Sequence, residues 1–524
     1  IVPTAVGGGF GGKLDISLQP YVAIAAWSLN RPVRCLYTRS ESMTSTTKRH
    51  PSDITVRVGA DADGKLVAMD FDGDYNTGAY SSWGPTVANR VPVHCSGPYV
   101  IPGMRARTRA VHTHNPSCGA FRGFGIPQAA IAQETMFDEL ADQLSLDRLE
   151  FRRINALRAG MPTATGQVLD SSVGMVACFD ALVPHWQAAL AKADALNRSG
   201  EKHFRYGVGV AGMWYGCGNT ALPNPSTIRV GLRADGKVVL FQGAVDIGQG
   251  SNTIMTQICS DALGIAIDKF SLVYGDTSLT ADAGKTSASR QTFVSGRATM
   301  LAGQDLRRKI LRLVNAGEDA TLSLRGTELS ISDQGQSHVI DLTALAAADN
   351  GLVLDGEGTF DPPTKALDVN GQGVPYATYG FGAQMAEVVV DEALGTVKVL
   401  RIVAAHDVGK AINPMFVEGQ IEGGIAQGLG LALMEDYVPG RTENLHDYLI
   451  PTAGDIPPIE TILIEDADPL GPFGAKGIGE QALIPTAPAI LLAIRHAVGV
   501  TIHQVPATPD RVRAMIRSAK GETI

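Results

Sequence analysis

The 524-residue sequence has few cysteines, and they form no motif. The six cysteines, at positions 35, 95, 118, 178, 217 and 259, are scattered singly, without a Cys-x-x-Cys pair. This spacing argues against an internal iron–sulfur cluster or zinc site, and it predicts a reducing, cytoplasmic location. His112 and His114 have no third ligand candidate nearby, so we interpret them as surface histidines rather than a metal site.

Basic blocks and membrane-spanning runs are also missing. The 44 lysines and arginines against 53 aspartates and glutamates give a net charge of −9, which argues against nucleic acid and anionic membranes as partners. The longest apolar stretches, residues 423–434 and 487–500, are too short or too interrupted to cross a bilayer, and we expect buried helices there. No basic segment followed by an apolar one opens the sequence, so we expect no signal peptide.

The pattern of turns and apolar residues predicts an α+β fold. Alternating apolar runs around Asp63-Gly64 and Asp235-Gly236, and a looser copy around Gly395, predict three antiparallel hairpins. Helices are expected from apolar periodicity and capping residues at 127–144, 176–196, 251–263, 416–434 and 485–500. We therefore predict related subdomains with antiparallel sheets and flanking helices. Residues 315–370 are more polar and are expected to form a surface excursion.

Glycine, in contrast, is abundant, and five of the six residues from Gly7 to Gly12 are glycines. Glycine lets backbone N–H groups approach a phosphate, an oxo group or another electron-rich atom. A dinucleotide fingerprint would need an acid some twenty residues later, where residues 30–33 read Asn-Arg-Pro-Val, and a P-loop would need Ser or Thr in place of Leu14. A glycine-lined contact with a larger cofactor is the third possibility. A flexible turn before a helix is less favoured at this glycine density, and the remaining motifs must decide among them.

Four further stretches, three of them punctuated by glycine, follow the opening loop in order. They are Gly-Ala-Phe-Arg-Gly-Phe-Gly at 119–125, Gly-Gln-Gly at 248–250, Thr-Ser-Ala-Ser-Arg-Gln at 286–291 and Gly-Ala-Lys-Gly-Ile-Gly-Glu at 474–480. Each is weak alone. Together with Glu-Gly-Gly-Ile-Ala-Gln-Gly-Leu-Gly at 422–430, the ordered set resembles the molybdenum-cofactor subunit of the xanthine dehydrogenase/aldehyde oxidoreductase family, the molybdenum hydroxylases. The resemblance covers essentially the whole chain.

The resemblance implies a molybdopterin cofactor, in its simple form or as a cytosine dinucleotide, and a role for each matching stretch. The pterin dithiolene would hold the molybdenum, so no protein side chain is expected to ligate the metal. The residues expected to bind the cofactor are Gly9, Phe10, Gly11, Arg122, Gly248, Gln249, Gly250, Ala288, Ser289 and Gln291. The first three would face the oxo ligand of the metal, and the others would bind the pterin and its phosphate.

The resemblance also implies a reaction, namely oxidative hydroxylation with water as the oxygen source and electrons passed to iron–sulfur clusters. Glu480 would be the general base and Gln427 would lie beside the metal. The expected substrate residues are Phe124, Leu14, Arg49 and Tyr215, although Phe124 and Tyr215 also suit a packed core.

The substrate class is narrowed by two of these residues. Leu14 stands where purine-oxidising members carry Glu, whereas Arg49 matches an arginine of those enzymes. We expect an N-heteroaromatic compound or an aldehyde as substrate. A purine such as xanthine or hypoxanthine stays open, as does a non-catalytic molybdopterin-binding remnant.

By the same resemblance, the chain divides into a first cofactor-binding subdomain at 1–165, a helical connection at 166–205 and a second cofactor-binding subdomain at 206–524. Family members carry a segment before the glycine loop that this sequence lacks. The expected partners are an iron–sulfur subunit, an FAD subunit and a separate chain that supplies this segment.

Overall fold

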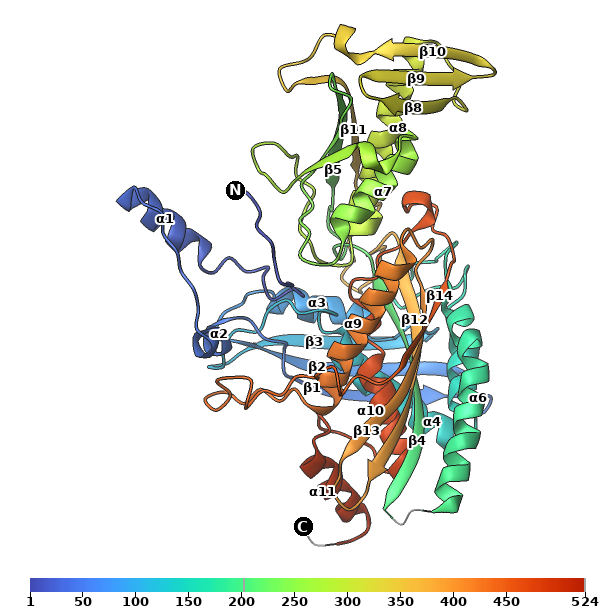
Figure 1. Cartoon of the computed structure of the whole chain (residues 1–524). Coiled ribbons are helices and arrows are strands. Elements are labelled where there is room, and N and C mark those ends of the chain that lie inside the picture. The colour runs from blue at the N-terminus through green and yellow to red at the C-terminus, as the bar shows by residue number, and fades with distance from the viewer. Residues whose placement is uncertain (201–202, 523–524) are drawn as a thin grey trace.

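The computed structural model describes residues 1–200 and 203–522, whose strands form four sheets. Figure 1 shows an elongated molecule with the β8–β10 sheet (Thr321–Arg325, Glu328–Asp333 and Gln336–Asp341) at one end and α11 (Pro509–Ala519) at the other. Helices flank the three larger sheets, and antiparallel pairs predominate within the sheets. The α+β fold predicted from the sequence is confirmed.

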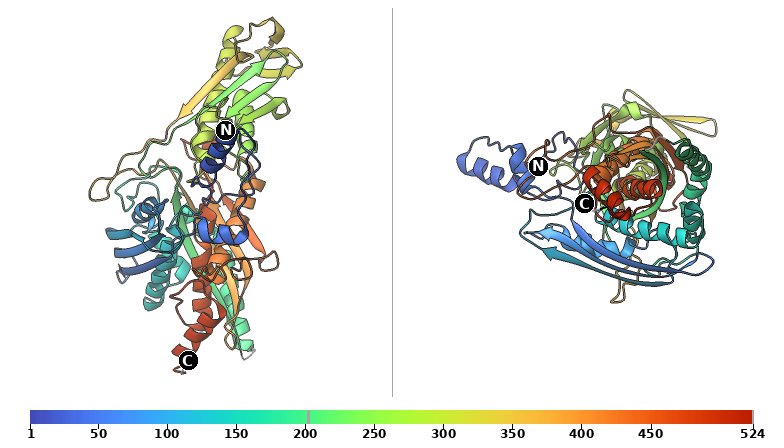
Figure 2. Two further views of the ribbon diagram at one scale, coloured as in Figure 1. Left: turned by 90° about the vertical axis from the view of Figure 1, so that its left-hand side faces the viewer. Right: turned by 90° about the horizontal axis from the view of Figure 1, so that it is seen from below.

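The first sheet has the strand order β1-β2-β3, with β1 at Ser52–Ala60, β2 at Leu66–Gly78 and β3 at Gly103–His112. β1 and β2 form the first predicted hairpin, whose turn contains Gly64 at φ 78°. Every second residue of β2 is buried, because one face of the sheet packs against α3 (Gly84–His94) and α4 (Ile126–Gln143). α5 (Arg148–Asn155) follows α4. Figure 2 shows this sheet beside the long axis of the molecule.

The two helices that follow the glycine loop lie on the outside of this region. The glycine loop is followed by α1 (Gln19–Leu29) and α2 (Arg39–Ser45). α1 projects from the body of the molecule (Figure 1), and none of its residues is buried.

The central sheet has the order β14-β13-β12-β4, with bounds Ile459–Ile464, Val397–Asp407, Tyr379–Asp391 and Phe204–Gly216. β12 and β13 form the third predicted hairpin. α6 (Met175–Ser199), the helix predicted at 176–196, and α10 (Thr486–Val498) pack against the sheet, and α9 (Pro414–Leu433) packs on α10. α10 approaches β4 closely because Gly209 has no Cβ, which would lie 2.3 Å from Ala489 O.

The buried helices predicted at 423–434 and 487–500 are therefore confirmed. The stretch Gln481–Val498 is apolar and long enough to cross a membrane by composition, but 78% of it is buried inside the protein.

The third sheet has the order β11-β5-β6-β7, with bounds Leu352–Phe360, Ser226–Arg233, Val238–Gln242 and Phe270–Tyr274. β5 and β6 form the second predicted hairpin. α7 (Ser251–Leu263), which has the predicted bounds, packs against α8 (Gly296–Leu313) beside this sheet. Short helical turns lie at Ile267–Lys269, Gln291–Ser295, Leu342–Ala344, Pro472–Gly474 and Gln481–Leu483.

The segment 315–370, expected to be a surface excursion, does lie at one end of the molecule (Figure 1), but it is folded into the strands β8–β10 and β11. Its Leu324, Leu329 and Ile331 join the hydrophobic core of the third sheet. These strands were not predicted, because strands with only two or three buried apolar residues leave little pattern in a polar sequence.

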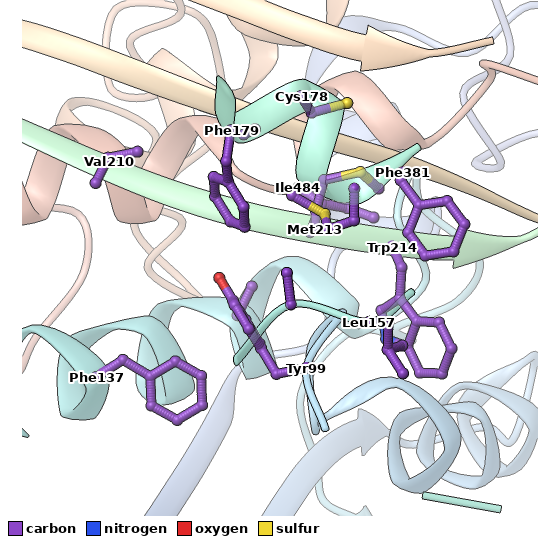
Figure 3. Packing of buried hydrophobic residues seen from close by; sticks show 14 of the residues in the cluster. Tyr99, Phe137, Leu157, Cys178, Phe179, Val210, Met213, Trp214, Phe381 and Ile484 are labelled. Carbon is purple, nitrogen blue, oxygen red and sulfur yellow. The ribbon is translucent and has the colours of Figure 1, made fainter. Parts of the chain in front are cut away.

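One hydrophobic core joins the first sheet to the central sheet. Figure 3 shows Tyr99 and Phe137 facing Phe179 of α6 and Met213 of β4 within this cluster. The Tyr99 hydroxyl donates to Glu134 at 2.8 Å, which satisfies its buried polar end. The two halves of the chain are thereby packed together, and the loops at their junction form a cavity.

Candidate active site

The cavity has a volume of about 1020 Å³. Its walls come from residues 6–14, 83–90 and 120–124 on one side and from 247–249, 285–292, 408–420 and 476–480 on the other. It therefore collects the glycine-punctuated stretches that lie far apart in the sequence. Its size is at the upper end of the range usual for ligand pockets.

Most of the predicted site residues meet in this cavity. Those that line it are Gly9, Phe10, Gly11, Leu14, Arg122, Phe124, Gly248, Gln249, Ala288, Ser289, Gln291 and Glu480. Four others, Gly250, Gln427, Arg49 and Tyr215, lie behind the wall. Gly250 is the N-cap of α7, and Gln427 accepts a hydrogen bond from Arg122 at 3.3 Å.

Glu480 is held in the cavity by a tight turn at Ala288 and Ser289. Its Oε1 accepts the main-chain N–H of Ala288 at 3.1 Å, and its other carboxylate oxygen accepts the Ser289 hydroxyl. The main-chain N–H of Glu480 donates back to Ser289 Oγ at 2.9 Å. Ala288 and Ser289 have φ values of 58° and 50°, a left-handed conformation that residues with a Cβ rarely adopt. Such strain is typical of functional sites, and here it aims two donors at one carboxylate.

Arg122 ties the loop of Glu480 to helix α9. Its Nε donates to Gly479 O and its Nη2 to Gln420 O at 2.9 Å. The side chain is buried, and burial lowers the pKa of Arg122 to about 10, an effect that nearby Glu480 opposes. The guanidinium remains charged at neutral pH.

Arg49 supports Arg122 from outside the cavity. Its Nη2 donates to Arg122 O at 2.9 Å, and its guanidinium lies 4.2 Å from the centre of the Phe121 ring. The structure thus places Arg49 behind the site, in a buttressing position.

The N-terminal glycine loop packs against the loop that carries Arg122. Phe10 O accepts the main-chain N–H of Arg122 at 2.7 Å. Gly11 has a φ of 98°, and a Cβ at this position would lie 2.9 Å from Ala120 O. Leu14 donates to Gly11 O at 3.0 Å and reaches the cavity wall. This close backbone contact explains the glycine at position 11.

Gln249 uses its side chain to shape its own turn. Its Oε1 accepts the main-chain N–H of Ile247 at 2.7 Å, and its Nε2 donates to Ser251 Oγ at 3.1 Å. The Asp246 carboxylate accepts Gly248 N at 2.8 Å from the same turn. The turn before α7 is therefore preorganised.

The sequence analysis missed Arg90, a buried cation of the cavity wall. Its guanidinium lies 4.2 Å from the Tyr215 ring and 5.1 Å from the Tyr376 ring, and it donates to Gly216 O at 2.9 Å. Within the described residues, no carboxylate forms a salt bridge with it, and its Nε is buried without a partner. An arginine inside the apolar run of residues 87–95 was the signal that could have revealed it.

An aromatic wall and a lysine stand beside Arg90. Phe124, half-buried with a φ of 51°, packs edge to face on Trp83 at 6.4 Å, and Lys285 Nζ lies 4.2 Å from the Trp83 ring. Trp83 and Lys285 were also missed. Lys285 directly precedes the stretch at 286–291, but only packing brings it to Trp83.

The charges of the cavity favour an anionic ligand. The lining contains six cations and one acid, Glu480. Two of the cations, Lys410 and Lys476, form ion pairs with the carboxylates of Glu465 and Asp407 outside the lining. The remaining four are Arg90, Arg122, Lys285 and Arg290. Burial lowers the pKa of Arg290 to about 10, an effect that Asp282 and Asp361 oppose. Gln291 Oε1 is buried without a hydrogen-bond partner, so this acceptor in the cavity wall is available to a donor from a ligand.

Comparison with known proteins gives consistent matches along the chain. The molybdopterin cofactor-binding domain family matches residues 1–156 and 182–457. A probable xanthine dehydrogenase subunit of Bacillus subtilis is 34% identical over 98% of this chain and 68% of its own length. Among solved structures, the aldehyde oxidoreductase of Desulfovibrio desulfuricans has a TM-score of 0.87 and 32% identity, covering 97% of this chain and 54% of that one.

Quinoline 2-oxidoreductase of Pseudomonas putida is also similar, with a TM-score of 0.85 and 26% identity, covering 98% of this chain and 68% of that one. The chain thus spans 54% of the aldehyde oxidoreductase chain, about half, and 68% of the other two relatives.

Proposed function

This chain belongs to the molybdenum hydroxylase family of xanthine dehydrogenases and aldehyde oxidoreductases, and we propose that it is the catalytic subunit of such an enzyme. The reaction would be oxidative hydroxylation of an N-heteroaromatic compound or an aldehyde, with water as the oxygen source. The observation that carries the proposal is the Glu480 carboxylate, held by Ala288 and Ser289 in a cavity large enough for a cofactor and a substrate.

The residues of the cavity fit a molybdopterin cofactor. Its phosphate would offset the positive charge of Arg122 and Arg290, two buried cations whose pKa values are lowered by burial. The unpartnered Gln291 Oε1 would accept a hydrogen bond from the pterin. Main-chain groups of Gly9, Phe10 and Gly11 would approach the metal end of the group, while 248–250 and 288–291 would hold the pterin.

When bound, this cofactor supplies two-electron oxidation and an oxygen derived from water. The chain supplies the base: Glu480, as a carboxylate with both oxygens in hydrogen bonds, would take up the proton released as the substrate is hydroxylated. Arg90 would stabilise negative charge that develops on the substrate, because it is a buried cation without a salt bridge in the described structure. Phe124 and Trp83 would orient a planar ring by stacking.

Two observations bear on the substrate class. Leu14 presents an apolar side chain to the cavity, which favours an aldehyde or a weakly polar N-heteroaromatic ring. A purine is the second candidate, supported by the similarity to a probable xanthine dehydrogenase subunit. A turnover comparison of xanthine, nicotinate, quinoline and benzaldehyde with a dye acceptor separates these classes.

The two electrons taken from the substrate must leave the site. We therefore also propose an iron–sulfur subunit and an FAD subunit as partners that accept them. Its support is the similarity to a relative named as one subunit of a xanthine dehydrogenase. We also propose that the cofactor is bound in its cytosine dinucleotide form. We further propose a cytoplasmic location, because six free cysteines suit a reducing compartment.

The deciding experiment measures molybdenum per chain and turnover on the purified complex, for the wild type and for Glu480→Gln. We expect retained molybdenum and a loss of turnover by about 10²–10⁴-fold, as for the removal of a general base. Glu357→Gln, an exposed glutamate of β11 paired with Arg229, is the matched control and should keep full activity. Absence of molybdenum from the wild-type complex would refute the proposal. Molybdenum without turnover on any substrate class would favour the non-catalytic remnant.

A further inference from the structure

A fully buried ion pair lies directly behind the loop that carries Glu480. Lys476 Nζ is 2.6 Å from Asp407 Oδ2, and neither side chain has any exposed surface. Lys476 Nζ also donates to Ser172 O at 2.8 Å. The residue borders the cavity, but protein encloses its ammonium group on all sides. Lys476 is therefore unavailable as a phosphate-binding cation.

The Asp407 carboxylate joins further segments to this pair. Its Oδ2 accepts the main-chain N–H of Gly174 at 3.2 Å, and its Oδ1 accepts that of Gly409 at 3.0 Å. A Cβ at Gly174 would lie 2.8 Å from the Asp407 carboxyl carbon, so the contact requires glycine. The pair thereby connects the segment before α6, the end of β13 and the loop at 474–480.

The same loop is fixed at both ends. At its start, the main-chain N–H of Lys476 donates to Val408 O at 2.9 Å. At its end, Arg122 binds Gly479 O and Ser289 binds Glu480. Only residues 477–479 lie between, and Gly477 is pressed so closely on Ser289 that a Cβ would lie 1.9 Å from Ser289 O. Because these contacts hold the loop at both ends and at Gly477, a shift of Lys476 must also move Glu480.

We propose that the Lys476–Asp407 pair is a positioning device that sets the direction of the Glu480 carboxylate without touching substrate or cofactor. This inference rests on the proposed function for its effect on turnover. Its structural part, that the pair holds the 474–480 loop in place, stands independently. Buried ion pairs often contribute little net stability, because the cost of desolvating both charges offsets their attraction. We therefore attribute this pair to the placement of the 474–480 loop rather than to stability.

The test removes both charges together, as Lys476→Met with Asp407→Asn, because either change alone leaves an uncompensated buried charge. The matched control is Lys192→Met with Glu387→Gln, a 2.9 Å lysine–carboxylate pair between α6 and β12 outside the cavity lining. On the purified complex, hydrogen–deuterium exchange of peptides covering 474–481 reports the loop. Molybdenum per chain reports cofactor binding, and kcat and KM are measured with whichever of xanthine, nicotinate, quinoline or benzaldehyde the wild type oxidises fastest.

In the Lys476→Met, Asp407→Asn variant we expect amide hydrogens of the loop to exchange about 10-fold faster, with molybdenum content unchanged. We expect kcat to fall about 10- to 100-fold, while KM changes less than about 3-fold. The control pair should change none of these. Unchanged exchange in the loop, or a loss of molybdenum that matches the loss of activity, overturns the inference. If the double variant yields no soluble protein, Asp407→Glu keeps both charges but displaces the ammonium group, and it should give the same pattern. A wild-type complex without molybdenum would refute the proposed function, while the exchange comparison would still decide whether the pair positions the loop.

Discussion

The main-chain N–H of Ala288 donates to Glu480 Oε1 at 3.1 Å, across 192 residues of sequence. This bond joins the stretch at 286–291 to the loop at 474–480. It also requires Ala288 to adopt a φ of 58°, so the protein keeps a strained turn to hold one carboxylate. The direction of Glu480 thus depends on contacts from outside its own loop.

Ser289→Ala removes the hydroxyl that donates to Glu480 and leaves the Ala288 bond in place. We expect kcat to fall about 10-fold, equivalent to about 1.4 kcal/mol of barrier, because the carboxylate loses one of its two fixing contacts. Steady-state kinetics checks this, with Ser330→Ala in β9 as a distant control. An unchanged kcat would show that Ala288 alone positions Glu480.

Gly11→Ala should disturb the glycine loop, whereas Gly12→Ala should not. At Gly11 a side chain meets both a φ of 98° and the Ala120 carbonyl at 2.9 Å, while at Gly12 the nearest atom is Gly9 O at 3.7 Å. We expect the first variant to lose about 1–3 kcal/mol of stability and most of its molybdenum. Thermal melts and metal analysis of the two variants provide the comparison, and equal behaviour would contradict it.

Arg122→Met should release cofactor and weaken the fold, since the guanidinium bonds Gly479 O and Gln420 O inside the protein. We expect the unfolding free energy to fall by about 2–3 kcal/mol, because two buried carbonyls lose a charged donor. Arg122→Lys keeps the charge without the planar fork and should retain an intermediate molybdenum content. Denaturant titration and metal analysis measure the two effects separately.

Arg90→Met should lower kcat/KM by about 10²–10³-fold while molybdenum content stays constant, as expected for loss of transition-state charge stabilisation. Arg90→Lys keeps the charge but loses the stacking on Tyr215 and should be less impaired. Full activity in Arg90→Met would mean that Arg90 only packs against its aromatic neighbours.

Stability should fall on acidification below about pH 6.5, partly because burial lowers the pKa of several histidines, among them His50 and His406. Burial, assisted by Arg49, lowers the pKa of His50 to about 4; burial, assisted by Arg122, lowers that of His406 to about 3. Between these values and about 6.5, the unfolded state binds more protons, so the unfolding free energy decreases as the pH falls, by about 1.4 kcal/mol per pH unit for each residue at most.

Denaturant titrations between pH 7 and pH 4 measure this slope. His50→Gln should flatten it, since the substituted side chain does not titrate. An identical slope in the variant would assign the acid sensitivity to other groups.

Local chemistry explains why much of the fold was predictable. The turns at Gly64, Gly236 and Gly395 have positive φ values, and each joins an antiparallel pair at the predicted place. The helix at 251–263 was also predicted correctly, because glycines directly flank it in the sequence, Gly250 at its start and Gly264 at its end. Backbone preferences and short-range capping act within a few residues, so the sequence displays them directly.

The site could be predicted only in part, because many of its contacts join residues that are far apart in the sequence. By sequence alone, the ordered motifs, Arg122 and Glu480 indicated the family, and most of the site residues predicted with them line the cavity. Only the tertiary structure brought Arg90 into the wall, placed Arg49 behind it and paired Lys476 with Asp407. These relationships depend on packing between segments far apart in the chain, where burial and charge decide which groups meet, and no local pattern encodes them.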